Sequence, residues 1–82
     1  MTKKLTQAVF KNAPSWAKSA AVDEDSTLCY FSHTKEHLCV LQVSKIWGYK
    51  EKLFGVKCKE FGTGYDTTDW QNSAINREGW EL

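Results

Sequence analysis

The sequence predicts a small α+β domain with a four-stranded antiparallel sheet, arranged as a meander, and a short helix near each end. Several short runs of β-branched and aromatic residues follow one another between Ser19 and Phe61, and polar turns separate them. Short connections between consecutive strands favour antiparallel neighbours. Helix-capping residues stand near both ends, at Thr6 and Thr68. The 82 residues leave room for one domain, residues 1–82.

The N-terminal part of the chain is predicted to hold the first helix and the first strand. Thr6 can cap a short helix over residues 7–12. Pro14 ends this helix, because the residue before a proline avoids helical angles. Residues 19–22 form the first predicted strand. The polar residues 23–26 form the turn that follows, since such side chains bond their own backbone.

The middle of the chain supplies the next strands, over residues 27–32 and 38–43. The second of these runs is almost wholly apolar, which favours a central strand. A helix over residues 34–42 is the alternative, although two valines in this region favour a strand. Residues 46–49 are predicted to continue the strand region.

Residues 53–61 are predicted to form a half-buried strand, because apolar and basic side chains alternate from Val56 to Lys59. The inward face is predicted to hold Phe54, Val56, Cys58 and, after a phase slip, Phe61, and the outward face Lys57 and Lys59.

Glycines end this strand, and a new helical turn is predicted to follow. Asp66 and Thr68 can offer side-chain oxygens to its free N–H groups, and Thr68-x-x-Gln71 fits the capping-box pattern. We expect Trp70 to fold back on the sheet and to anchor this turn.

Three segments stand out in this sequence: GYDTTDWQNSAI-RE, the opening residues 4–10 and residues 20–25. In these segments the two ends of the chain resemble a family of very small proteins encoded by phages and prophages. Residues 29–59 diverge from the family. The resemblance implies a phage origin, and no activity of the family carries over to this chain.

Composition narrows the class of function. The net charge of +1 gives no strong electrostatic basis for binding nucleic acid or a membrane. No apolar run matches a signal peptide or approaches the length of a membrane span. We therefore expect a protein of the host cytoplasm, whose three cysteines are reduced thiols.

Four potential metal ligands stand close together in the sequence: Cys29, His33, His37 and Cys39. Their C-x3-H-x3-H-x-C spacing matches no zinc motif, and strand alternation predicts that the two cysteines face opposite sides. We expect no metal and no other cofactor.

Catalytic patterns are equally weak. Nucleophilic catalysis needs a cysteine beside a histidine with an orienting acid. Cys29 and His33 could be neighbours on one face, but the sequence has no nucleophile elbow and no activated thiol at a helix start. Helix capping explains Asp66 and Asp69, and the glycines at 62–64 lack the full phosphate-loop pattern. We expect that the protein is not an enzyme.

The eleven aromatic residues exceed the needs of so small a core, so some are expected at the surface. Aromatic and basic residues alternate along residues 47–59. The predicted binding residues are Trp47, Tyr49, Lys50, Lys52, Lys57 and Lys59.

The favoured hypothesis is a phage-encoded accessory or anti-defence protein that blocks a host protein by binding its surface. One alternative is a binder of a small nucleotide signal, which would require a homo-oligomer because one small domain rarely encloses a pocket. Another is a weak nucleic-acid-binding regulator, which the near-neutral charge disfavours.

Overall fold

The computed structural model describes residues 4–50 and 55–78 and contains two antiparallel sheets. The larger sheet has the strand order β5-β2-β1-β6, and β3 pairs with β4 in a separate hairpin. The strands are β1 (Ser19–Val22), β2 (Leu28–Phe31), β3 (Leu38–Leu41), β4 (Ile46–Tyr49), β5 (Cys58–Gly62) and β6 (Ile75–Asn76). The helical elements are the 3-10 turns η1 (Gln7–Asn12), η2 (Lys35–His37) and η3 (Trp70–Asn72).

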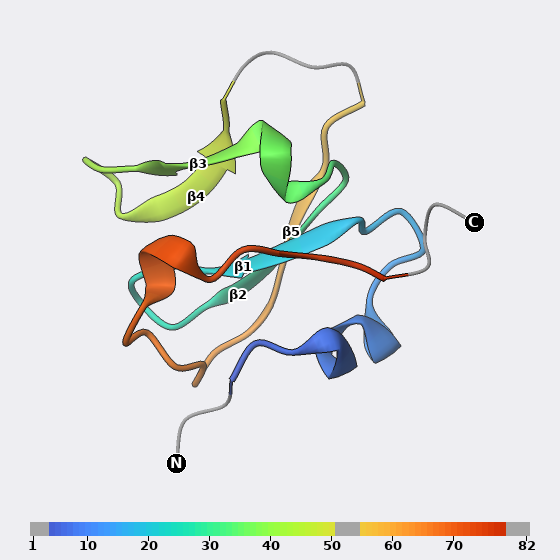
Figure 1. Cartoon of the computed structure of the whole chain (residues 1–82), viewed down its shortest axis with the longest axis horizontal. Helices are drawn as coiled ribbons and strands as arrows, with labels where there is room; N and C mark the ends of the chain where they lie inside the picture. The colour runs from blue at the N-terminus through green and yellow to red at the C-terminus, as the bar shows by residue number, and fades with distance from the viewer. Residues whose placement is uncertain (1–3, 51–54, 79–82) are drawn as a thin grey trace.

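The larger sheet is the middle of three layers (Figure 1). The residues of β1 and β2 that face η1 form one core cluster with Phe10 and Tyr65. The alternate residues of the same strands form a second cluster with Leu38 and Ala74, on the side of the hairpin. Because both faces are covered, every residue of β1 and β2 is buried.

Small side chains suit β1 to this central position. Ala20 and Ala21 point to opposite faces and have no exposed surface, so both outer layers can approach the strand closely. Tyr30 on β2 fills the η1 side, where its hydroxyl donates a hydrogen bond to the Val9 carbonyl. The core therefore depends on a few large side chains set beside small ones.

The structure confirms a four-stranded antiparallel sheet, but the predicted meander is wrong. The chain leaves the larger sheet after β2, forms the β3–β4 hairpin, and returns as β5 on the other side of β2. The prediction that residues 38–43 form a central strand is also wrong. β3 spans only Leu38–Leu41, and its exposure increases along its length. The prediction failed because a continuous apolar run does not reveal whether one layer or two will cover it.

Capping differs between the two ends of the chain. Thr6 accepts a hydrogen bond from the Ala8 N–H at 3.3 Å and caps η1, as predicted. The predicted Thr68-x-x-Gln71 capping box is not made, because η3 begins after Asp69, which makes no side-chain cap bond. Instead, the carboxylate of Asp66 accepts from both the N–H and the hydroxyl of Thr68, at 2.9 and 2.6 Å. Trp70 is buried, as expected of an anchor.

The predicted phase slip at Phe61 is present as a register shift in β5, between the pairs Leu28–Gly62 and Cys29–Glu60. The ring of Phe61 is half exposed and packs on Tyr30, with the ring centroids 5.5 Å apart. The inward facing predicted for Val56 is wrong, since it is exposed. Cys58 lies on the face of the sheet that carries Cys29 and Phe31, but it is exposed as well, like Lys57 and Lys59. β5 is an edge strand that the outer layers cover incompletely. Phe54 lies outside the described residues.

Candidate functional site: the outer face of the hairpin

The β3–β4 hairpin has two different faces because side chains alternate along a strand. Its register pairs Leu38 with Tyr49 and Val40 with Trp47 on the face toward the larger sheet. Leu38, Trp47 and Tyr49 pack against the core cluster there. The alternate pairs, Cys39 with Gly48 and Leu41 with Ile46, belong to the outer face.

The outer face is apolar and open. Leu41 and Ile46 are 39% and 38% exposed, and Val43 in the connecting turn is 99% exposed. Gly48 makes room for Leu41, because a Cβ atom on this glycine would lie 2.8 Å from the Leu41 Cδ1. The leucine therefore lies flat across the hairpin, beside Ile46. We call Leu41, Val43, Ile46 and Gly48 the outer hairpin face.

The turn between β1 and β2 holds the hairpin from one side. The Asp23 carboxylate accepts a hydrogen bond from the Trp47 N–H at 2.8 Å, and the Glu24 N–H donates to the Lys45 carbonyl at 3.2 Å. The indole N–H of Trp47 donates to the Trp70 carbonyl at 3.0 Å. Burial raises the pKa of the Asp23 carboxyl, and its hydrogen bonds oppose this rise only in part.

A cluster of hydrogen bonds around Ser32 holds the hairpin at its other end. The Tyr49 hydroxyl accepts from the Ser32 N–H at 3.0 Å and donates to the Lys57 carbonyl at 2.8 Å. The Ser32 hydroxyl accepts from the Lys57 N–H at 2.7 Å and can donate to the Gly55 carbonyl. These contacts join β2, β4 and the segment that leads to β5, so the hairpin is fixed at both ends.

The structure divides the predicted binding residues among different surroundings. Trp47 and Tyr49 lie half-buried on the inner face of the hairpin, not at an exposed rim. Lys50 is exposed beside Tyr49, whereas Lys57 and Lys59 belong to the β5 region. The Lys57 ammonium lies 5.8 Å from the centre of the Trp16 ring, a cation–π distance. Lys52 lies outside the described residues.

The sequence analysis missed Leu41, Val43 and Ile46 as surface residues, because it placed residues 38–43 in the centre of the sheet. One signal was available in the segment Gln42-Val43-Ser44-Lys45, which is polar apart from its valine and separates two short apolar runs. Such a segment is typical of a hairpin turn, and a valine within it would be exposed.

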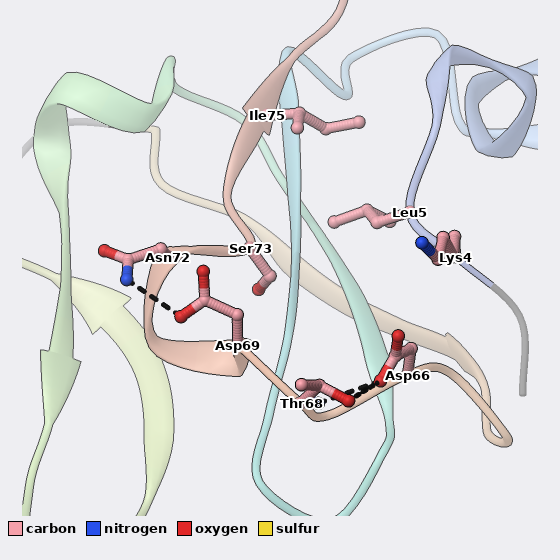
Figure 2. A pocket seen from close by; sticks show the side chains of 8 residues that line it. All are labelled: Lys4, Leu5, Asp66, Thr68, Asp69, Asn72, Ser73 and Ile75. Atoms are coloured by element: carbon pink, nitrogen blue, oxygen red, sulfur yellow. Dashed lines mark hydrogen bonds between the residues drawn. The ribbon is translucent and has the colours of Figure 1, made fainter.

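A shallow hollow of about 400 Å³ lies between the N-terminal segment and the C-terminal turn (Figure 2). Its lining includes two carboxylates, Asp66 and Asp69, and one lysine, Lys4. Hydrogen bonds from the Thr68 side chain and backbone lower the pKa of Asp66, so this carboxyl is charged at neutral pH. Asp69 accepts from the Asn72 amide at 2.9 Å. Two carboxylates make this hollow unsuitable for phosphate groups.

The four potential metal ligands do not form a centre. Cys29 is buried in the core, and Cys39 belongs to the hairpin. The rings of His33 and His37 pack edge to face, 5.8 Å apart. Within residues 4–50 and 55–78, no group of three or more histidine, cysteine or acidic side chains is arranged to hold a metal ion.

Comparison of the chain with protein-family models, curated proteins and solved structures gives no match. The phage resemblance of its two ends therefore stays a prediction. Of the helices in the described part of the chain, none has the length and apolar character needed to cross a membrane.

Proposed function

We propose that this chain is a protein-binding module that presents its outer hairpin face to an apolar strip on a partner protein. The observation that carries the proposal is the contrast within one hairpin. The inner face is packed and hydrogen-bonded, whereas the pair Leu41 and Ile46 on the other face is partly exposed and Val43 in the adjoining turn is almost fully exposed. Adjoining exposed aliphatic residues mark interaction surfaces more often than isolated ones do.

The charges around this face indicate the chemistry of the partner. Residues 38–50 include Lys45 at the turn and Lys50 at the open end, and they include no acidic residue. Both lysines are exposed. A partner strip flanked by carboxylates would complement this pattern, and the charges would speed association and fix orientation more than they would add affinity.

Blocking a partner requires only that the bound chain cover part of its surface. A stable interface buries roughly 800 Å² on each partner, so a hairpin face and its neighbouring loops are large enough to contribute its centre. Together with the phage resemblance, this supports an accessory or anti-defence protein that disables a host protein by occupying its surface. No catalytic group is needed for that role.

The hollow beside Asp66 weakens the nucleotide-signal alternative, since its lining includes two carboxylates, Asp66 and Asp69, which would repel phosphate groups, besides Lys4. The weak nucleic-acid alternative loses support because Lys50 and Lys57 belong to different layers. A second copy of this chain is a further possible occupant of the face, and the experiment below distinguishes it.

The test is capture from host lysate with the wild-type chain and with Val43→Asp. Val56→Asp is the matched control, because Val56 is an exposed valine outside the hairpin. The proposal predicts a captured protein that Val56→Asp retains and Val43→Asp loses, and whose purified form binds the wild type directly. Equal capture by both variants would contradict it. So would sedimentation showing that the wild type is a dimer and that Val43→Asp is a monomer.

A further inference from the structure

Two of the three cysteines lie on the same side of the larger sheet, in neighbouring strands. Cys29 of β2 is opposite Glu60 of β5, and Cys58 of β5 is opposite Phe31 of β2. The two cysteines are therefore diagonal neighbours on one face of the β2–β5 ladder. Cys29 is only 4% exposed, whereas Cys58 is open to solvent.

A carboxylate completes the arrangement. The Cys29 thiol lies 3.6 Å from the Asp23 Oδ2, to which it can donate its proton. The neighbouring Cys29 thiol lowers the pKa of the Cys58 thiol. Cys58, burial and the charge of Asp23 raise the pKa of Cys29. The exposed sulfur is thus the one favoured as a thiolate, and the buried one keeps its proton beside a base.

We propose that Cys58 and Cys29 form a redox-reactive pair, in which Cys58 reacts with a hydroperoxide and Cys29 then closes a disulfide. In the first step the Cys58 thiolate attacks the peroxide O–O bond. It becomes a sulfenic acid, and an alkoxide or hydroxide leaves and takes up a proton. In the second step the Cys29 sulfur attacks the Cys58 sulfur and displaces its hydroxyl. Asp23 accepts the thiol proton and passes it to the departing hydroxyl, which leaves as water.

Strand geometry allows this bond after a small local adjustment. Diagonal neighbours on a regular ladder lie roughly 7–8 Å apart, and disulfides usually span Cα distances up to about 6.8 Å. The register shift at Phe61 lies beside this pair, and such a shift increases local twist and disturbs regular spacing. The register places both side chains on the same face of the sheet, as a disulfide between them requires.

Oxidation of the pair would reach the hairpin through Asp23. One oxygen of this carboxylate faces the Cys29 thiol, and the other accepts from the Trp47 N–H. Disulfide formation removes the Cys29 thiol proton that faces Asp23. The electrostatic environment of the Trp47 N–H, which is bonded to the same carboxylate, therefore changes. The amide resonance of Trp47 should therefore shift on oxidation.

The test is treatment of the reduced full-length chain with hydrogen peroxide, followed by alkylation and mass spectrometry. The proposal predicts a loss of two hydrogens per chain and a linked peptide pair that contains Cys29 and Cys58. In Cys29→Ser, oxidation should stop at a Cys58 sulfenic acid that dimedone traps. Cys39→Ser is the matched control and should behave as the wild type, since Cys39 lies in the separate hairpin.

Three results would overturn the proposal. One is a wild-type chain that accumulates sulfenic or sulfinic acid at Cys58 without a linked pair. Another is a disulfide that includes Cys39, and the third is oxidation no faster in the wild type than in Cys58→Ser. The linked peptide is measured on the wild type, so the proposal stays testable if a Cys29 variant fails to fold. The result of the peroxide experiment is also independent of whether the hairpin binds a partner.

Discussion

The larger sheet and the β3–β4 hairpin are built from similar apolar runs, yet they use them differently. β1 and β2 bury both of their faces between two layers, so each of their residues belongs to the core. The hairpin buries one face and leaves the other open. The difference shows that an apolar run acquires its role from the number of layers that cover it, not from its composition alone.

The two regions also differ in how they are held. Apolar packing on both faces holds the larger sheet together. The hairpin is attached at its ends through the Asp23 carboxylate and the Tyr49 hydroxyl, in addition to the packing of its inner face. Substitutions should therefore act on the two regions through different physical causes, and their effects should decrease from the sheet to the outer hairpin face.

The largest effect is expected for Phe31→Ala. Phe31 is 1% exposed, and its ring meets that of Tyr49 edge to face, 5.6 Å apart, between the sheet and the hairpin. Its loss should lower the free energy of unfolding by about 3–5 kcal/mol, which is close to the whole margin of a small domain. Urea denaturation measures the change. A loss below about 1 kcal/mol would show that the two layers do not share a core.

A smaller effect is expected for Asp23→Ala, which leaves the Trp47 N–H without its partner. The expected cost is about 1–3 kcal/mol, the usual penalty for an unsatisfied buried donor. Hydrogen exchange at the Trp47 amide should also become faster than in the wild type. An unchanged exchange rate would show that this carboxylate does not hold the hairpin.

The same carboxyl group predicts a pH dependence. The pKa of Asp23 is raised in the fold above the ordinary value of 3.8, so folding favours its protonated form. Its contribution to stability is complete below pH 3.8 and decreases as the pH rises through the folded pKa. The stability of the wild type relative to Asp23→Asn should therefore decrease over this range. A relative stability that rises with pH would contradict the assigned direction.

Tyr49→Phe tests the second attachment of the hairpin. The substitution keeps the ring and removes the hydroxyl that bonds Ser32 and Lys57. We expect a loss of about 1–2 kcal/mol, because two backbone groups lose a partner while the apolar contact remains. The melting temperatures of Tyr49→Phe and Tyr49→Leu, compared with that of the wild type, separate the contribution of the hydroxyl from that of the ring.

The smallest effect on stability is expected for Val43→Asp. Val43 is 99% exposed in the hairpin turn, so the free energy of unfolding should change by no more than about 0.5 kcal/mol. Partner capture should nevertheless be lost. If the variant unfolded, Val43 would have to be part of the core, and the two faces of the hairpin would not differ as described.

Local signals in the sequence predicted much of the fold and little of the candidate site. The cap at Thr6, the strand at residues 19–22 and the slip at Phe61 depend on neighbouring residues, so the sequence carries them. The exposed position of Ile46 depends on the separation of the hairpin from the larger sheet. That separation arises from contacts distant in sequence, such as the bond from Asp23 to Trp47, which no local pattern encodes.

The most direct test of the central claim is the stability of a triple variant of the outer hairpin face, with Leu41, Val43 and Ile46 all changed to threonine. Threonine keeps the preference for strand structure and removes much of the apolar character. We expect a total loss of about 2 kcal/mol or less in urea denaturation, since Val43 is almost fully exposed and Leu41 and Ile46 are partly exposed already. A loss as large as that of Phe31→Ala would contradict it, because the outer face would then be part of the core.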